Sequence, residues 1–176
     1  MAGIQIERLS AKDIDANADR LAEILHACVL GGASIGFIAP FGLGDARAFW
    51  LETIRPEVSA GARRLLAGRI DGQIAGVAQL ALAMPANQRH RADVAKVLTH
   101  PAFRRRGVAR RLMTALEAEA IDTGRTLLVL DTRSGDPSER LYASLGYRKF
   151  GEIPGFARHP VEVRFEDATF MFKTIS

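Results

Sequence analysis

The sequence THPAFRRRGVA at residues 99–109 joins a predicted strand, residues 92–100, to a predicted amphipathic helix that begins near Val108. The first N–H groups of a helix have no partner within it, and the helix dipole adds about half a positive charge there. Gly107 and the small Ala109 let the backbone approach a diphosphate closely, and the neighbouring arginines add positive charge. We therefore predict a phosphate-binding turn at this junction.

The charge distribution favours the same kind of ligand. Residues 89–111 contain eight basic side chains and one acidic one, a net charge of +7, so the rest of the chain sums to 4 − 7 = −3. A focused positive patch on an acidic body indicates a polyanionic ligand. The turn is not a Walker A loop, because no Gly-Lys-Ser/Thr follows Gly107, and it lacks the G-x-G-x-x-G pattern of nicotinamide cofactors.

Composition bounds the class of protein. The 176 residues, 48% of them hydrophobic and 25% charged, suit one globular domain over residues 1–176. Cys28 is the only cysteine, so an intramolecular disulfide and a zinc site with two or four cysteines are excluded, and the four scattered histidines predict no metal. Because no apolar run is long enough to span a bilayer and no export signal opens the sequence, we expect a cytoplasmic protein without a membrane partner.

Hydrophobic periodicity predicts one order of elements along the whole chain. A first strand over residues 4–9 precedes a helix whose N-cap is Ser10, and a long apolar loop follows at residues 31–44. The second helix carries Trp50, and Pro56 is expected to kink or end it. The later elements are a hairpin around Asp71-Gly72, the strand at 92–100, a helix from Val108, a strand at 126–131, a helix at 141–145, and closing strands at 148–153 and 169–174 around a loop at 154–167.

A second motif, LYASLGY at residues 141–147, lies one predicted strand after the basic turn. Together with Pro101 and the R-x-x-G-x-A pattern of residues 104–109, it resembles the GNAT superfamily of acetyl-CoA-dependent N-acetyltransferases. The resemblance implies an α/β (α+β) fold: a mixed, mostly antiparallel central sheet, flanked by helices, with a splayed central strand pair. One departure is Gly135, which stands where many members carry an asparagine that contacts the cofactor.

The resemblance also implies a binding site for acetyl-CoA as cosubstrate. The backbone of Val97, Leu98 and Thr99 would align the pantetheine arm. The diphosphate would lie on the turn and the start of the helix, formed by Arg104, Arg105, Arg106, Gly107, Val108, Ala109 and Arg110.

Three side chains are candidate catalytic residues. The resemblance implies that the hydroxyl of Tyr142 protonates the leaving thiolate. Asp93 and Asp131 lie on neighbouring predicted strands, where both carboxylates could meet an ammonium group and take its proton directly or through water. The alternatives are that Asp93 pairs with Arg91, that Asp131 caps a turn, and that Tyr142 only packs.

A closer resemblance links the chain to the branch that contains the tabtoxin resistance protein, through GASIGF near Gly32, NQRHRADVAK from Asn87, LLVLDTR from Leu127 and GEIPGF from Gly151. It implies direct acetyl transfer to the amine of a small molecule. That molecule would be amino-acid-like, or an antibiotic or toxin that carries an amine. The alternatives are acetylation of a protein N-terminus or lysine, and a non-catalytic acyl-CoA-binding module.

Nucleic acid is not expected as a partner, since aromatic content is 7% and the usual motifs are missing. The apolar loop and the closing strands would suit a homodimer.

Overall fold

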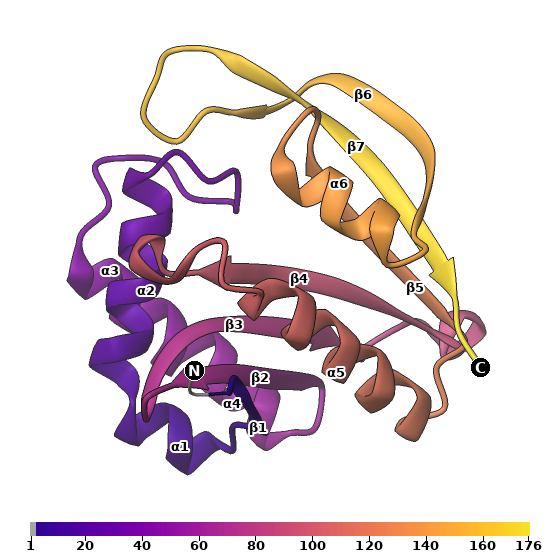
Figure 1. The fold of residues 1–176 in the computed structure, drawn as a ribbon, viewed down its shortest axis with the longest axis horizontal. Coiled ribbons are helices and arrows are strands. Elements are labelled where there is room, and N and C mark those ends of the chain that lie inside the picture. Colours follow the sequence, from indigo (N-terminus) through magenta and orange to yellow (C-terminus); the bar gives the residue numbers. More distant parts are fainter. Residues whose placement is uncertain (1–2) are drawn as a thin grey trace.

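One seven-stranded sheet runs through residues 3–176, the part of the chain that this computed structural model describes. The first two residues of the expected domain lie outside the described part. The strands lie in the order β1-β2-β3-β4-β5-β7-β6, and every neighbouring pair is antiparallel except β4 and β5 (Figure 1). This is the mixed, mostly antiparallel sheet that the sequence predicted.

The elements follow the predicted order closely. The strands are β1 (Gln5–Arg8), β2 (Arg63–Ile70), β3 (Gln73–Ala81), β4 (Arg91–Thr99), β5 (Leu127–Arg133), β6 (Arg148–Arg158) and β7 (Phe165–Thr174). The helices are α1 (Ala11–Ala16), α2 (Ala18–Leu30), α3 (Leu43–Ala48), α4 (Arg55–Ser59), α5 (Val108–Asp122) and α6 (Pro137–Ser144), with a π-helical turn η1 (Phe49–Ile54) and short 3₁₀ turns η2 (Ala86–Gln88) and η3 (Pro101–Phe103).

The sheet has an apolar core on each face. Alternate residues of a strand point to opposite faces, so Leu66 and Ile70 of β2 join the core beneath α5 and α6, while Leu65 and Ala67 join the core beneath α1–α4. Trp50 is completely buried in the second core and donates from Nε1 to the carbonyl of Leu21 at 2.9 Å. No helix in residues 3–176 is long and apolar enough to cross a membrane.

The expected loop at residues 154–167 was wrong. Strand β6 continues to Arg158 and β7 begins at Phe165, so only residues 159–164 connect them. Pro154 is tolerated because β6 is an edge strand, where a missing N–H removes no ladder bond on the open side. Apolar side chains remain exposed on these strands, among them Phe150 and Phe165, where the sequence favours a homodimer; that stays a prediction.

Two helix details also differ from expectation. The first helix begins at Ser10 as predicted, with Ser10 and Asp13 capping each other, but it is interrupted at Asn17. Pro56 does not end the second helix, which continues to Ser59. The residues just before α4 form a π-helical turn, so Pro56, which lacks an N–H, lies where the α-helical hydrogen-bond pattern is already interrupted.

Gly76 of β3 is required where β3 and β4 approach each other. A Cβ added to Gly76 would lie 2.5 Å from the carbonyl oxygen of Leu98 and 3.0 Å from Cγ1 of Val108. The first contact is too short for real atoms and the second is tight, so the strands and the start of α5 are packed together through this glycine.

We expect Gly76→Ala to lower the free energy of unfolding by about 1–3 kcal/mol, because the new methyl group displaces backbone. Gly151→Ala is the control, since Gly151 also lies in a strand and a Cβ there meets nothing within 4 Å. Urea denaturation of both variants measures the difference. Equal stabilities would show that β3 and β4 can move apart without cost.

Candidate active site

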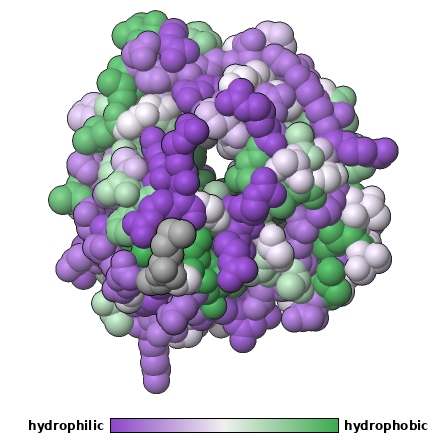
Figure 2. Space-filling view, in the orientation of Figure 1, coloured by the Kyte–Doolittle hydropathy of each residue, from purple (hydrophilic) through white to green (hydrophobic). Residues whose placement is uncertain are grey.

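A slot opens in the sheet because β4 and β5 pair at one end only. Their parallel register joins residues 91–93 to residues 127–129 and then stops. Beyond this point β4 continues along β3, and β5 continues along β7. We call the space between residues 94–99 and residues 130–133 the slot. Figure 2 shows an opening through the molecule in the region where Figure 1 has β4 and α6 on opposite sides.

The basic turn lies at the end of β4 that borders the slot. Gly107 adopts a φ of +85°, which an L side chain rarely takes, and α5 begins directly after it. Gly107 offers the first turn of α5 no capping side chain, so N–H groups there are free for an anion. Within residues 3–176, the exposed Arg104, Arg105 and Arg106 form no ion pair with an acid. Unpaired cations around a free helix N-terminus fit a diphosphate.

Arg110 and the predicted pantetheine segment border the same region. Arg110 donates from Nη2 to Oγ of Ser144 at 2.7 Å, which ties α5 to α6. Residues 97–99 lie on the part of β4 that has no β5 partner. Backbone groups on that edge are therefore free to bond an extended ligand in the manner of a strand.

Tyr142 lies on the face of the sheet that α5 and α6 cover. Its side chain belongs to that core, 6% exposed, with its ring centroid 5.9 Å from that of Tyr147. Burial raises the pKa of Tyr142, and the negative charges of Asp136 and Asp131 raise it further. The hydroxyl therefore keeps its proton at neutral pH and can act as a hydrogen-bond donor.

The two candidate acids, Asp93 and Asp131, lie on the face of the sheet opposite to Tyr142. They differ in whether a cation pairs with them. Leu130 of β5 points into the core beneath α6, so by strand alternation Asp131 points to the other side. Asp93 makes a short contact with Nη1 of Arg91, which offsets its charge. Asp131 is exposed and has no ion pair within the described part of the chain. An incoming ammonium group would therefore meet an uncompensated carboxylate at Asp131.

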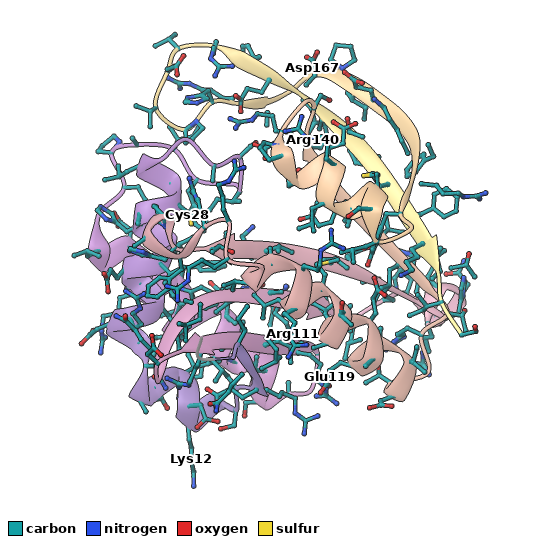
Figure 3. All side chains as sticks on the ribbon, in the orientation of Figure 1. Lys12, Cys28, Arg111, Glu119, Arg140 and Asp167 are labelled. Carbon is teal, nitrogen blue, oxygen red and sulfur yellow. The ribbon has the colours of Figure 1, made fainter. Side chains whose placement is uncertain are left out.

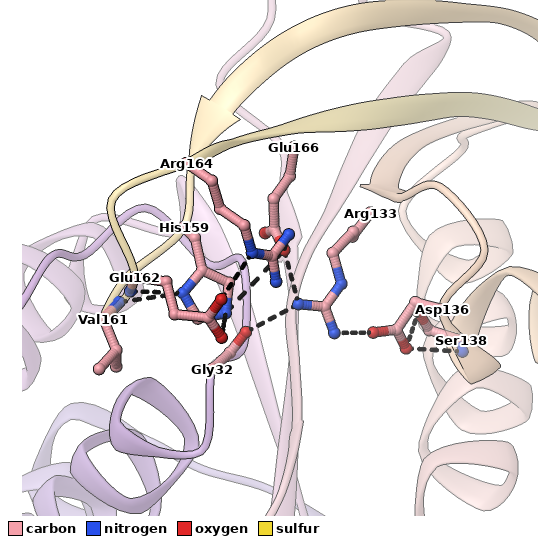
Figure 4. A network of polar contacts seen from close by, with 9 residues as sticks. All are labelled: Gly32, Arg133, Asp136, Ser138, His159, Val161, Glu162, Arg164 and Glu166. Carbon is pink, nitrogen blue, oxygen red and sulfur yellow. Dashed lines mark hydrogen bonds and ion pairs between the residues drawn. The ribbon is translucent and has the colours of Figure 1, made fainter.

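A cluster that the sequence did not predict ties the outer end of the slot together (Figure 4). Arg133, at the end of β5, donates from Nη1 to the carbonyl of Gly32 and to Oε1 of Glu166, both at 3.0 Å. Glu166 is buried, with its side chain 3% exposed, and Arg164 also reaches its Oε1 at 3.0 Å. His159 accepts from the N–H of Glu162 at 2.8 Å and thereby shapes the tip of the β6–β7 hairpin.

The same hairpin tip holds the apolar loop at residues 31–42. The N–H of Ala39 donates to the carbonyl of Pro160 at 2.7 Å. Together with the Arg133–Gly32 bond, this contact anchors the loop on the side of the sheet that carries Asp131. No spacing rule links residues 32, 133, 159 and 166, so only the folded chain brings them together.

A family model for the acetyltransferase (GNAT) family matches residues 23–147, which include the basic turn, the slot and Tyr142. The chain belongs to the GNAT family. It is 33% identical over 136 residues to an uncharacterized N-acetyltransferase from the hisH–hisA intergenic region of Azospirillum brasilense, a match that covers 76% of this chain and 77% of that one.

Solved structures of other GNAT-fold proteins share the architecture. The yncA protein of Salmonella typhimurium, solved with its cofactor acetyl-CoA, is 22% identical with a TM-score of 0.79 and coverage of 99% and 95%. A ribosomal-protein-alanine N-acetyltransferase from Brucella melitensis is 23% identical with a TM-score of 0.80 and coverage of 97% and 99%. These likenesses confirm the predicted fold.

Family membership establishes the general reaction. The protein is a GNAT-type N-acetyltransferase, and acetyl-CoA is the cosubstrate of this family. Residues 3–176 contain no group of three or more His, Cys, Asp or Glu side chains placed to hold a metal ion. Cys28 packs in the core with Sγ 3.5 Å from the carbonyl of Thr99, and burial raises the pKa of its thiol (Figure 3).

We expect Arg133→Met to lower the free energy of unfolding by about 1–3 kcal/mol, because it removes the bonds to Gly32 and to the buried Glu166 carboxylate, which keeps Arg164 as a partner. Arg164→Met removes a half-exposed partner of the same carboxylate and should cost about 1 kcal/mol or less. Chemical denaturation compares the two variants. Equal losses would mean that Arg133 does not carry the connection between β5 and the apolar loop.

Proposed function

We propose that the whole chain works as one acetyltransferase domain that transfers the acetyl group of acetyl-CoA directly to the amine of a small molecule. The slot between β4 and β5 is the main support for this proposal, because the unpaired strand edges there leave the two faces of the sheet connected. Tyr142 lies on the α5–α6 face and Asp131 on the face of the apolar loop. An acetyl donor and an amine can therefore approach each other from opposite sides.

The donor side is assigned to the turn and the free edge of β4. The N–H groups of Val108, Ala109 and Arg110, with residues 104–106, would hold the diphosphate, and Gly107 would leave room for it. The open edge at Val97, Leu98 and Thr99 would align the pantetheine arm. When bound, acetyl-CoA supplies the thioester whose acetyl group is transferred.

The acceptor side is assigned to the two acids. Asp131 attracts the ammonium group and takes its proton, directly or through water, which frees the amine lone pair for attack. Asp93, whose charge is offset by Arg91, is the weaker of the two candidate bases. Tyr142 donates its proton or a hydrogen bond to the thiolate that leaves.

A small acceptor is favoured over a protein one because bonded segments border the outer end of the slot. The Ala39–Pro160 and Arg133–Gly32 bonds hold the apolar loop against the hairpin tip and the end of β5. The resemblance to the tabtoxin resistance branch favours an amino-acid-like amine or a toxin. Thiol release with a panel of small amines and a peptide N-terminus tests this choice, and faster turnover of the peptide would overturn it.

Gly107→Glu should weaken acetyl-CoA binding by at least about 100-fold, since it places a carboxylate where phosphate is expected and removes charge-assisted bonds. Gly61→Glu is a matched control: Gly61 also has a positive φ, +72°, and its surroundings are open. Calorimetric titration of acetyl-CoA measures both variants. Wild-type affinity in Gly107→Glu would remove the diphosphate from this turn.

Tyr142→Phe should lower kcat by about 10²- to 10⁴-fold, as expected for loss of a general acid, while acetyl-CoA affinity stays unchanged. Tyr147→Phe removes a hydroxyl from the neighbouring buried ring and should keep kcat near wild type. Single-turnover thiol release separates the chemical step from binding. If both variants turned over equally, Tyr142 would be a packing residue and a non-catalytic donor-binding role would gain weight.

A further inference from the structure

Lys96 occupies an irregular position in β4, beside the slot. Val77 of β3 faces Leu98 and Gln79 faces Ala95, so a single β3 residue stands opposite both Lys96 and Val97. This is a β-bulge, and Lys96 adopts a φ of +48°, uncommon for a residue with a long side chain. Bulges beside active sites re-aim side chains, and here the lysine is turned towards the apolar loop.

The ammonium group of Lys96 lies against aromatic rings and lacks an anionic partner. Its Nζ is 5.6 Å from the ring centroid of Phe37 and 6.0 Å from that of Phe49. A Cβ on Gly36 of the loop would lie 3.7 Å from it. Within residues 3–176, no carboxylate oxygen lies within 4.0 Å of Nζ, and no hydrogen bond engages it.

A half-buried ammonium without hydrogen bonds is costly. It carries three N–H donors, and aromatic faces replace only part of its hydration. Burial lowers the pKa of Lys96, the positive charge of Arg63 lowers it further, and the negative charge of Asp131 raises it. An anion in direct contact with Nζ would satisfy these donors and keep the lysine charged.

Lys96 and Asp131 both border the slot and carry opposite charges. They belong to the two strands that diverge there, and within the described residues the two side chains do not form an ion pair with each other. A ligand that carries both an ammonium and a carboxylate would complement this arrangement: its amine would face Asp131 and its carboxylate would face Lys96. The rings of Phe37 and Phe49 would give such a ligand an apolar wall.

We propose that Lys96 is a specificity-determining residue that binds a carboxylate of the acceptor, so that the substrates of this enzyme are amines that also carry a carboxylate. This inference rests on the proposed function, because it assumes a small acceptor in the slot. It also implies selection against polyamines, whose second cation would be repelled by Lys96.

The test compares amino acids with their carboxamides, which lack the carboxylate charge and carry a less basic amine, so that the amides would react faster if no group bound the carboxylate. We expect the wild-type enzyme to acetylate methionine, phenylalanine and glutamate with a kcat/KM about 10- to 100-fold above that for the matching α-carboxamides, the range of a hydrogen bond to a charged group. The difference should lie mainly in KM. Putrescine serves as the dication and should be the poorest acceptor, with thiol release as the readout.

Lys96→Met removes the charge at nearly constant length and should bring the acid-to-amide ratio close to one, whereas Lys96→Arg should preserve the preference. Lys12→Met is the matched control, because Lys12 is exposed on α1 and points away from the body of the protein, far from the slot (Figure 3). Acetyl-CoA binding by calorimetry checks that each variant is folded.

The outcomes separate this inference from the proposed function. If the wild type acetylates the carboxamides or putrescine as well as the acids, the role of Lys96 is wrong while the small-molecule function stands. A preference for acids that survives in Lys96→Met also overturns it. If no small amine is turned over but a peptide N-terminus is, the proposed function itself fails. The comparison of substrates with the wild-type enzyme needs no variant, so it tests the inference even if a substituted protein misfolds.

Discussion

The site depends on the divergence of β4 and β5. Backbone N–H and C=O groups normally pair along the whole of a sheet, because leaving them without partners costs free energy. Here the pairing stops at Asp93 and Val129, while β3 and β7 hold the outer edges of the two strands. The bulge at Lys96 and the close contact of Gly76 with Leu98 fix β4 against β3. The inner edges therefore stay open for a ligand without loosening the rest of the sheet.

This divergence also explains how the charges are distributed. A continuous sheet would separate Tyr142, packed beneath α5 and α6, from the acids on the other face. In the mechanism that we propose, the buried hydroxyl of Tyr142 and the exposed carboxylate of Asp131 would serve one reaction through the slot while their environments stay distinct. Burial raises the pKa of Tyr142 and keeps its proton in place, whereas Asp131 is exposed and forms no ion pair within the described residues. In that proposed mechanism, Tyr142 would give a proton while Asp131 accepts one.

Much of the fold followed from local sequence. The basic turn, the Asp71-Gly72 hairpin and the Ser10 cap depend on residues close together in the chain, and each was recognised correctly. The bulge at Lys96 was missed because its cause is the register with β3, which the β4 sequence alone does not contain. The length of β6 and β7 was missed for a similar reason: an edge strand tolerates Pro154, whereas composition suggested a loop.

The active site is likewise divided between features set by local sequence and features set by tertiary contacts. This difference decides what the sequence can say about the substrate. The donor side that we propose is one continuous stretch, residues 97–110, so its motif can be recognised from the sequence alone. The acceptor side that we propose combines the loop at 31–42, Lys96, Asp131 and the hairpin tip at 159–166, which only tertiary contacts such as Arg133–Gly32 bring together. A change in any of these distant segments can alter the acceptor without touching the donor side. Acceptor specificity therefore has to be sought in the loop, the bulge and the hairpin tip rather than in the motif that identifies the family.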